Sequence, residues 1–352
     1  MSLFVDISKR LKDFSLDVRF ETDGERMALL GASGCGKSMT LKCIAGLEKP
    51  DRGRIVLNGR VLFDSARRID RSPQERRVGY LFQQYALFPN MTVRQNLEAA
   101  VRHLPKAQRA AAAEEKLRAY RLADVAERYP RQISGGQQQR AALARTLLSE
   151  PECLLLDEPF SALDSYLRWQ TELELGEVLR AYPGDAVLVT HDRGEAYRLC
   201  ETVCVLSGGR SEEKTDVRTL MAAPRTVGAA RISGCKNIVR ARRAGEGRVA
   251  CPDWGLTLET AQPIPEGAIC AGIRAHSLRP ARGGGANVFS ARVARVIEDP
   301  FSVILMLAPE GGGALLRAEL PKDSVPAPDA DGAVRFCVAP EDVMILTGEA
   351  DD

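Results

Sequence analysis

The order of apolar and polar positions divides the chain into two parts. Up to about residue 225, short apolar runs alternate with longer segments of helical character. Runs such as Arg26–Leu30, Cys153–Leu156 and Ala186–Val189 are almost wholly apolar, as are strands buried on both faces of a sheet. This alternation is typical of an α/β domain with a mostly parallel sheet.

Other segments complete the expected α/β pattern. Strands are also expected over Arg54–Leu57, Arg77–Phe82 and Thr202–Leu206. Helices are expected over Lys37–Ala45, which is closed by Gly46, over the Ala-, Glu-, Lys- and Arg-rich stretch Pro105–Arg121, and over Gln138–Leu148.

Past Pro224 the pattern changes to short strands separated by turns rich in Gly and Pro. This region also repeats itself. Residues 237–241 (Asn-Ile-Val-Arg-Ala) are echoed by residues 287–291 (Asn-Val-Phe-Ser-Ala), and residues 267–274 are echoed by residues 332–339. Such echoes at matching places favour a duplicated small β-barrel unit. We therefore expect an α/β domain over residues 1–228, with a helical subdomain at about 90–150, and an all-β, OB-like barrel domain over residues 229–352.

Charge and composition narrow the function classes. The formal net charge of the 352 residues is +2, so bulk electrostatics do not favour a nucleic-acid partner. No window approaches the roughly 20 apolar residues that a membrane span needs, and no signal peptide is visible at the start. The nine cysteines include no Cys-x-x-Cys pair, so we expect small buried residues in a reducing compartment. A membrane role would require docking onto another subunit.

The segment Gly31–Ser38 has the sequence and the context of a phosphate-binding loop. It reads Gly-Ala-Ser-Gly-Cys-Gly-Lys-Ser, follows an apolar strand and opens a helix. The backbone N–H groups of such a loop wrap phosphates, and the helix dipole attracts negative charge. Lys37 is expected at the β- and γ-phosphates, and the Ser38 hydroxyl at Mg²⁺. The expected nucleotide-binding residues here are Gly31, Ala32, Ser33, Gly34, Cys35, Gly36, Lys37, Ser38 and Met39.

Two further motifs carry chemistry. The apolar run Cys153–Leu156 ends in Asp157 and Glu158. Asp157 is placed to hold Mg²⁺, and Glu158 to orient and deprotonate an attacking water. Residues 134–137 (Ser-Gly-Gly-Gln) open the helix that leads to this strand, with Ser134 as the N-cap, so they form a second candidate anion site.

Taken in order, these motifs resemble the nucleotide-binding subunit of ABC transporters over about two thirds of the chain. That family's glutamine loop would be at Gln83, its signature at Ile133–Gln137, and its lone histidine at His191, which ends an apolar strand beside the one that ends in Glu158. The segment Ser161–Asp164 matches the family's remaining motif. No aromatic residue clearly matches the one that stacks on adenine, and Phe4 and Phe14 are the nearest.

The resemblance implies a head-to-tail homodimer that binds ATP and Mg²⁺. ATP on one subunit's phosphate loop would be capped by the other subunit's Ser134, Gly135, Gly136 and Gln137. Gln83 would lie at Mg²⁺ and the attacking water, His191 at the γ-phosphate, and Asp164 would relay between the two sites. Catalysis would fall to Glu158, His191 and Gln83, and metal binding to Ser38, Gln83 and Asp157.

The stretch Arg76–Pro89 resembles importer ATPases, in which it docks a helix of the membrane partner; core packing is the other interpretation. Residues 53–64 and the short N-terminus are similar to molybdate importers and their sulfate relatives, and the C-terminal part is similar to duplicated oxyanion-type regulatory domains. The resemblance implies integral permease subunits, indirectly a substrate-binding protein, no nucleic acid, and a peripheral place on the cytoplasmic face of the membrane.

The expected function is therefore ATP hydrolysis that drives import, with molybdate as the first cargo and sulfate or thiosulfate, polyamine or iron as alternatives. A second hypothesis is an ABC ATPase that works on nucleic acid or the ribosome, although the long insertions or second cassette usual there are not seen. A third makes the C-terminal part an oxyanion store or sensor. Ser233, Lys236 and Asn237 could present donors to an oxyanion, although a solvated loop is the favoured interpretation for them.

Overall fold

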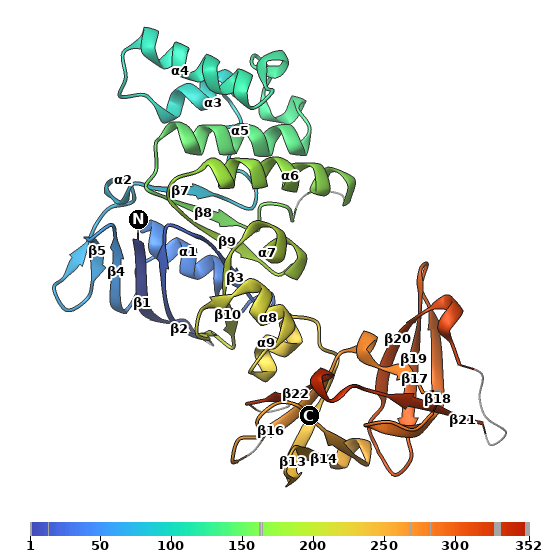
Figure 1. Ribbon diagram of the computed structural model, residues 1–352. Helices are drawn as coiled ribbons and strands as arrows, with labels where there is room; N and C mark the ends of the chain where they lie inside the picture. The colour runs from blue at the N-terminus through green and yellow to red at the C-terminus, as the bar shows by residue number, and fades with distance from the viewer. Residues whose placement is uncertain are drawn as a thin grey trace. The chain divides into compact units, whose positions relative to one another are not determined.

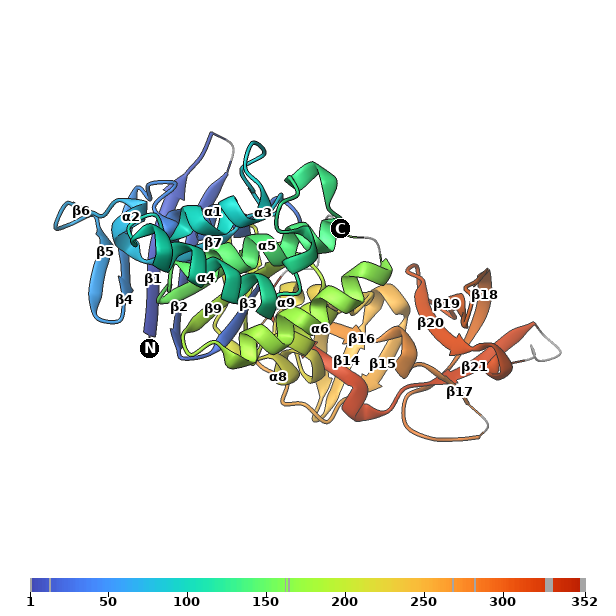
Figure 2. The ribbon, with the colours of Figure 1, turned by 90° about the horizontal axis from the view of Figure 1, so that it is seen from above.

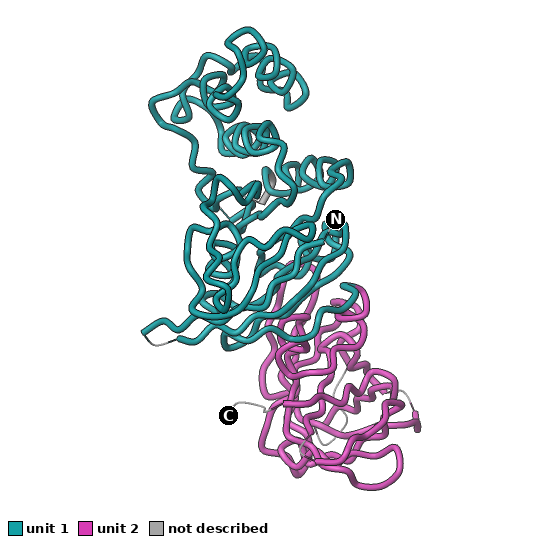
Figure 3. The backbone as a smooth tube through the Cα atoms, turned by 90° about the vertical axis from the view of Figure 1, so that its left-hand side faces the viewer, with its two compact units in different colours: residues 1–217 teal, residues 218–352 magenta. Residues whose placement is uncertain are grey.

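A computed structural model describes residues 2–12, 14–161, 163, 165–267, 269–281, 283–326 and 332–348. The chain divides into two compact units, Met1–Val217 and Arg218–Asp352 (Figure 3). The boundary expected after residue 228 lies inside the second unit. Helix α9 (Val227–Ile232) accounts for this, because Val227 and Ala230 pack with Cys270 and Leu346 of the second unit.

The first unit is built around one 12-stranded sheet (Figure 1). Its strands are β1(Ser2–Arg10), β2(Ser15–Asp23), β3(Arg26–Leu30), β4(Arg52–Leu57), β5(Arg60–Asp64), β6(Ile69–Asp70), β7(Val78–Leu81), β8(Cys153–Asp157), β9(Asp185–Thr190), β10(Thr202–Ser207), β11(Arg210–Ser211) and β12(Thr215–Asp216). Its helices are α1(Lys37–Ala45), α2(Pro73–Arg76), α3(Val93–Ala100), α4(Lys106–Ala119), α5(Gly135–Leu148), α6(Ser165–Ala181) and α7(Arg193–Leu199), and α8(Val217–Ala222) spans the division between the units.

The sheet joins a parallel part to an antiparallel part. Strands β10, β3, β9, β8 and β7 are neighbours in that order, and each pairs with the next in parallel. Strands β8 and β9 are buried at every position, which explains their unbroken apolar runs. The expected parallel α/β core is thus confirmed. The antiparallel ribbon β6–β5–β4–β1–β2 extends it by way of β11. Strand β2 there alternates buried and exposed positions because only one face is covered.

Helices α3, α4 and α5 lie together as a group and share a core of their own (Figure 1). Val93, Leu97, Leu117, Ala141 and Ala144 belong to that core. Each of α3 and α5 starts at a capping box, formed by Thr92 with Gln95 and by Ser134 with Gln137. Within the described part of the chain, no helix is long and apolar enough to cross a membrane.

All nine cysteines are free, and eight of them are buried, as the composition predicted. The ninth, Cys337, is half-buried. Burial raises the pKa of the Cys251 thiol to about 12, so that thiol stays protonated and packs as a small apolar side chain.

The second unit holds two antiparallel sheets of five strands each (Figure 2). Its strands are β13(Asn237–Gly245), β14(Arg248–Cys251), β15(Leu256–Glu259), β16(Ile269–Ile273), β17(Arg279–Pro280), β18(Val288–Glu298), β19(Ser302–Pro309), β20(Leu316–Pro321), β21(Ala333–Cys337) and β22(Val343–Leu346). The orders are β15-β14-β13-β16-β22 and β20-β19-β18-β21-β17. The two orders match strand for strand, so the expected duplication is confirmed.

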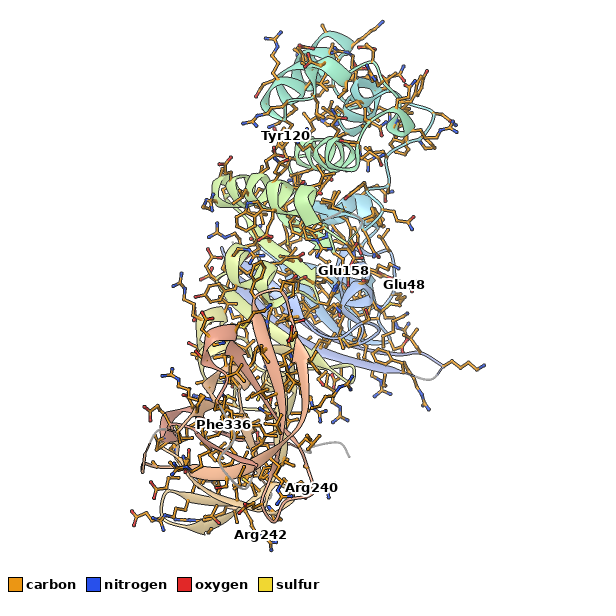
Figure 4. The ribbon with its side chains drawn as sticks, turned by 90° about the vertical axis from the view of Figure 1, so that its right-hand side faces the viewer. Glu48, Tyr120, Glu158, Arg240, Arg242 and Phe336 are labelled. Carbon is orange, nitrogen blue, oxygen red and sulfur yellow. The ribbon has the colours of Figure 1, made fainter. Side chains whose placement is uncertain are left out.

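The two halves exchange their last strands. In each half a single 3₁₀ turn, Ala275–Ser277 or Pro340–Asp342, leads from the fourth strand to the fifth. The fifth strand of the first half, β17, pairs with β21 of the second half, and β22 of the second half pairs with β16 of the first. Both sheets also contribute to one core, which contains Trp254 and the fully buried Phe336 (Figure 4). The halves therefore fold as one body.

Two asparagines join the halves by equivalent hydrogen bonds. The Asn237 side chain accepts from the Arg317 N–H at 2.7 Å and donates to the Arg317 carbonyl at 2.9 Å. The Asn287 side chain likewise accepts from the Glu259 N–H at 2.6 Å and donates to the Glu259 carbonyl at 2.9 Å. Asn237 begins β13, the first strand of the first half, and is hydrogen-bonded to β20, the third strand of the second half. Asn287 directly precedes β18, the first strand of the second half, and is hydrogen-bonded to β15, the third strand of the first half. The solvated-loop interpretation is wrong for Asn237, which is 3% exposed and engaged within the fold, and for Ser233, which is equally buried.

We expect Asn237→Ala to destabilise the second unit by about 1–3 kcal/mol, because it leaves a backbone N–H and a carbonyl of Arg317 without partners. Trp254 lies in this unit and Trp169 in the other, so in a Trp169→Phe background the fluorescence of Trp254 follows urea unfolding of this unit. The exposed neighbour gives the matched control, Lys236→Ala, which should unfold at the wild-type urea concentration. Equal midpoints for the two variants would show that the asparagine contributes nothing to joining the halves.

Candidate functional site

The site lies where three neighbouring parallel strands end. Strand β3 is followed by Gly31, β8 by Glu158 and β9 by His191. Strands β3 and β8 each pair with β9, with Leu30 opposite Thr190 and Asp157 opposite Val189. The three residues that follow therefore emerge at the same edge of the sheet, where α/β folds bind ligands.

The phosphate loop is shaped by two glycines that admit no side chain. Gly36 has φ +106°, and a Cβ there would come within 2.5 Å of a methyl carbon of Leu16. A Cβ at Gly31 would lie 2.4 Å from the Leu206 carbonyl oxygen. Helix α1 starts directly after Gly36, so the N–H groups of its first turn open onto the loop. The loop is thus built to bring bare backbone close to an anion.

The Lys37 ammonium points back into the loop. It is 4% exposed, and Nζ donates to the carbonyl oxygens of Gly31 at 2.8 Å and Ala32 at 2.9 Å. Its Nζ also lies 4.0 Å from Oε1 of Glu158. The Cys35 thiol lies 4.0 Å from the same Nζ; burial raises the pKa of this thiol, although Lys37 opposes the shift.

Asp157 connects three elements. It is 5% exposed; its Oδ1 accepts from the Ser38 hydroxyl at 2.7 Å, and its Oδ2 accepts from the Tyr80 phenol at 2.8 Å. Burial, with a contribution from the Asp157 charge, raises the pKa of Tyr80, so the phenol keeps the proton that it donates. The motifs read from the sequence include Ser38 and Asp157 but not Tyr80.

Glu158 is held in an uncommon backbone conformation between two cationic or polar partners. Its φ is +43°, and its N–H donates to the Val189 carbonyl at 3.0 Å, which ties it to β9. Such a φ is uncommon for a residue other than glycine and persists where the surroundings enforce it. Oε2 lies 3.4 Å from Nδ1 of His191, and Oε1 faces Lys37. Figure 4 labels Glu158 within the first unit.

Other expected residues do not join this cluster. Gln83 is exposed just after β7. Ser134–Gln137 begin α5, and among the described residues no hydrogen bond or ion pair links them to the phosphate loop. Asp164 lies outside the described residues. Phe14 touches the loop, since a Cβ on Gly36 would lie 3.1 Å from its ring, whereas Phe4 lies in β1.

A buried arginine anchors the other end of helix α1. Arg76 is fully buried, and its Nη1 donates to the carbonyls of Cys43 and Ile44 at 2.7 and 2.8 Å, which satisfies the end of the helix. Its Nη2 donates to Asp70 at 3.0 Å. A Cβ on Gly46 would lie 2.5 Å from the Arg76 Nε, so the guanidinium fits only because this residue is glycine. The helix that presents Lys37 and Ser38 is thus fixed at both ends.

A second hollow lies away from this edge. An open cavity of about 600 Å³ is lined by the end of α4, by α5 from Gln139 to Leu147 and by α6 from Thr171 to Ala181. Leu143, Leu147, Leu175 and Val178 are among its apolar lining residues. Gln139 also lines it; this residue is 1% exposed, and its Nε2 has no hydrogen-bond partner among the described residues.

The chain is similar to known proteins over both units. A profile of the family described as ABC transporter matches residues 11–161. The sulfate/thiosulfate import ATP-binding protein CysA of Gloeobacter violaceus is 46% identical over 60% of this chain. The molybdenum import ATP-binding protein ModC of Paramagnetospirillum magneticum is 37% identical over 63% of it. These two alignments cover 62% and 61% of the relatives' own lengths.

A longer alignment and a solved structure extend the comparison. The spermidine/putrescine import ATP-binding protein PotA of Rubrobacter xylanophilus is 37% identical over 87% of this chain and 83% of its own length. One similar solved structure is a dimeric ATP-binding cassette in a post-hydrolysis state, bound to ADP and Pi. The superposition covers 62% of this chain and 99% of the cassette, with a TM-score of 0.53 and 29% sequence identity.

Proposed function

Because this chain belongs to the ABC transporter family, we propose that it hydrolyses ATP to drive import through a membrane permease. The observation that carries the proposal is the convergence of Lys37, Ser38, Asp157, Glu158 and His191 at one edge of the sheet. A cation, a hydroxyl, two carboxylates and an imidazole at a phosphate-binding loop are the groups that hydrolysis of a phosphoanhydride needs.

The residues present fit Mg²⁺. The Ser38 hydroxyl and the Asp157 carboxylate, joined at 2.7 Å, are oxygen donors of the kind that this ion prefers. Mg²⁺ is usually held by one or two protein oxygens together with phosphate and water, so two such donors are enough. We propose that these two residues hold the ion, with Gln83 joining from the segment after β7. Bound there, Mg²⁺ neutralises charge on the phosphate oxygens.

The remaining groups act on the nucleotide and the water. The Lys37 ammonium exchanges its two loop carbonyls for β- and γ-phosphate oxygens. Glu158 accepts the proton of the water that attacks the γ-phosphorus, and the bond to the β–γ bridging oxygen breaks to give ADP and phosphate. His191, exposed beside Glu158, holds the γ-phosphate and keeps the carboxylate oriented. Of the two candidates to stack on adenine, Phe14 is the one we favour, because its ring lies close to Gly36 of the loop whereas Phe4 lies in β1.

We propose that the active form is a head-to-tail dimer. Within one chain the Ser134–Gln137 helix start has no bond to the phosphate loop among the described residues. The capping box engages the N–H groups of Ser134 and Gln137, and the N–H groups of Gly135 and Gly136 at the same helix start suit an anion. A second copy can bring that helix start to the γ-phosphate of the first, with Asp164 between the two sites. The likeness to a dimeric cassette bound to ADP and Pi supports this arrangement.

We further propose that the permease contributes an amphipathic helix to the cavity between α4, α5 and α6. The apolar lining suits one face of such a helix, and the unpartnered Gln139 Nε2 suits a carbonyl or carboxylate oxygen. The Tyr85 phenol, in the Arg76–Pro89 stretch, lies 3.5 Å from the Gln139 side-chain oxygen. A helix that docks at the cavity and moves Gln139 would therefore also displace the segment that contains Gln83. The chain would then work as a peripheral subunit on the cytoplasmic face of the membrane.

For the cargo we propose molybdate, with sulfate or thiosulfate and polyamine as the alternatives. The likeness to the molybdenum import protein supports molybdate. The likeness to the sulfate/thiosulfate import protein supports sulfate, and the alignment to a spermidine/putrescine import protein, which extends over both units, supports a polyamine.

Glu158→Gln should reduce ATP hydrolysis by at least about 100-fold, because the substitution keeps the size and removes the base. ATP binding should remain within a few-fold of wild type, since Lys37 and the loop are untouched. Rates are measured by phosphate release and binding by equilibrium titration. Glu152→Gln, at a partly exposed carboxylate paired with Arg60, is the control and should hydrolyse ATP normally. Near-normal hydrolysis by Glu158→Gln would remove this residue from the mechanism.

Mixed dimers test whether each site is shared between two chains. One dimer pairs a Lys37→Ala chain with a Ser134→Arg chain; the other pairs a chain carrying both changes with an unchanged chain. All chains also carry Glu158→Gln, so bound ATP is retained. If the sites are shared, the first dimer should occlude one ATP and the second none. The occluded ATP is measured as the radiolabelled nucleotide that each dimer retains. The reverse order would mean that each chain builds its own site.

Transport separates the cargo alternatives. The purified complex with its permease and binding protein, placed in lipid vesicles, should accumulate radiolabelled molybdate at the expense of ATP. An excess of unlabelled sulfate or spermidine should reduce this molybdate uptake weakly or not at all. Uptake of spermidine without molybdate would reject an oxyanion cargo, and a vesicle containing the Glu158→Gln chain is the control for uptake that does not depend on hydrolysis.

A further inference from the structure

Tyr80 forms a contact to the candidate metal site that none of the site motifs contains. Its phenol donates to Oδ2 of Asp157 at 2.8 Å, while the Ser38 hydroxyl occupies Oδ1 at 2.7 Å. Both oxygens of this buried carboxylate therefore have a donor on this chain. The two donors come from different elements, β7 and α1.

The register of the sheet produces this contact. In the parallel pair β7–β8, Tyr80 lies opposite Leu155, two residues before Asp157. Residues two apart in a strand face the same side, so Tyr80 and Asp157 lie on one face of the sheet. The phenol is long enough to reach forward along the strand to the carboxylate. The Phe82 ring, just beyond the end of β7, lies 4.3 Å from the Tyr80 ring by centroids and packs beside it.

We propose that Tyr80 is a positioning residue for Mg²⁺: it fixes the carboxylate of Asp157 in the orientation that binds the ion. A carboxylate can rotate about its last bond, and a hydrogen bond to the oxygen not held by Ser38 removes that freedom. Partners of this kind orient metal ligands, and their loss typically costs about 10- to 100-fold in metal affinity or activity. The inference rests on the proposed role of Asp157 as a metal ligand.

The alternative is that the bond serves only the phenol. A buried tyrosine usually finds a hydrogen-bond partner, whatever the use of that partner. The two roles differ in what a Tyr80→Phe chain loses. If the bond only satisfies the phenol, the chain loses stability; if the bond orients Asp157, the chain loses the advantage that Mg²⁺ gives to nucleotide binding.

The experiment measures this advantage directly in the full chain. The affinity for AMP-PNP, a non-hydrolysable ATP analogue, is titrated once with Mg²⁺ and once with EDTA, and the ratio of the two affinities is the metal gain. Tyr80→Phe should lower the metal gain by about 10-fold or more, with the affinity in EDTA unchanged. In ATP hydrolysis the same variant should need more Mg²⁺ for half of its maximal rate and should recover much of that rate at high Mg²⁺.

Tyr182→Phe is the matched control. Tyr182 is half-buried, and its phenol donates to the Pro151 carbonyl at 2.6 Å, not to Asp157. This variant should keep the metal gain of the wild type. A metal gain for Tyr80→Phe within twofold of the wild type would overturn the proposal, and so would an equal loss of affinity in Mg²⁺ and in EDTA.

Asp157→Asn separates this inference from the proposed function. It should lower the metal gain at least as much as Tyr80→Phe. If the wild type binds AMP-PNP with a metal gain that Asp157→Asn does not change, the proposed metal role of Asp157 is wrong, and that of Tyr80 fails with it. If Asp157→Asn lowers the metal gain and Tyr80→Phe does not, only the inference about Tyr80 is wrong.

Discussion

The carboxylate of Asp157 joins parts of the chain that are far apart in sequence. Ser38 and Asp157 are 119 residues apart, and Tyr80 and Asp157 are 77 apart, yet all three meet in two short hydrogen bonds. The bonds tie the first turn of α1 to the ends of β7 and β8. This junction helps to set the position of the phosphate loop relative to Glu158 and His191, together with the contact of Lys37 to Glu158 and the core that α1 shares with β8.

Three further contacts in the first unit hold the residues around that junction in place. Arg76 fixes the far end of α1, so the helix cannot slide away from the loop. Glu158 keeps a positive φ because its N–H is bound to β9. Lys37 is satisfied by loop carbonyls, so a buried ammonium has hydrogen-bond acceptors even without a phosphate. These arrangements leave the loop formed before a ligand arrives, which lowers the cost of ordering it on binding.

The sequence predicted the elements whose pattern is local. Strands β8, β9 and β10 follow apolar runs that end within a residue or so of the expected bounds, and α1 matches its expected range. Asp157, Glu158 and His191 were predictable because parallel strands end at one edge. The Tyr80 contact was not, since it depends on the register between strands 77 residues apart. The strand exchange of the second unit was equally hidden: residues 267–274 and 332–339 show repetition, but no local pattern says which half a fifth strand joins.

That exchange sets an order of events during synthesis. Strand β16 is complete long before its outer neighbour β22 exists, because β22 comes from residues 343–346. The outer edge of β16 therefore has no partner strand until the whole second half has been synthesised, at about 5–20 residues per second. An unpaired strand edge in a growing chain can pair with the wrong partner, including another nascent chain. The duplicated barrel therefore passes through an interval of several seconds in which the outer edge of β16 lacks the strand that covers it in the finished fold.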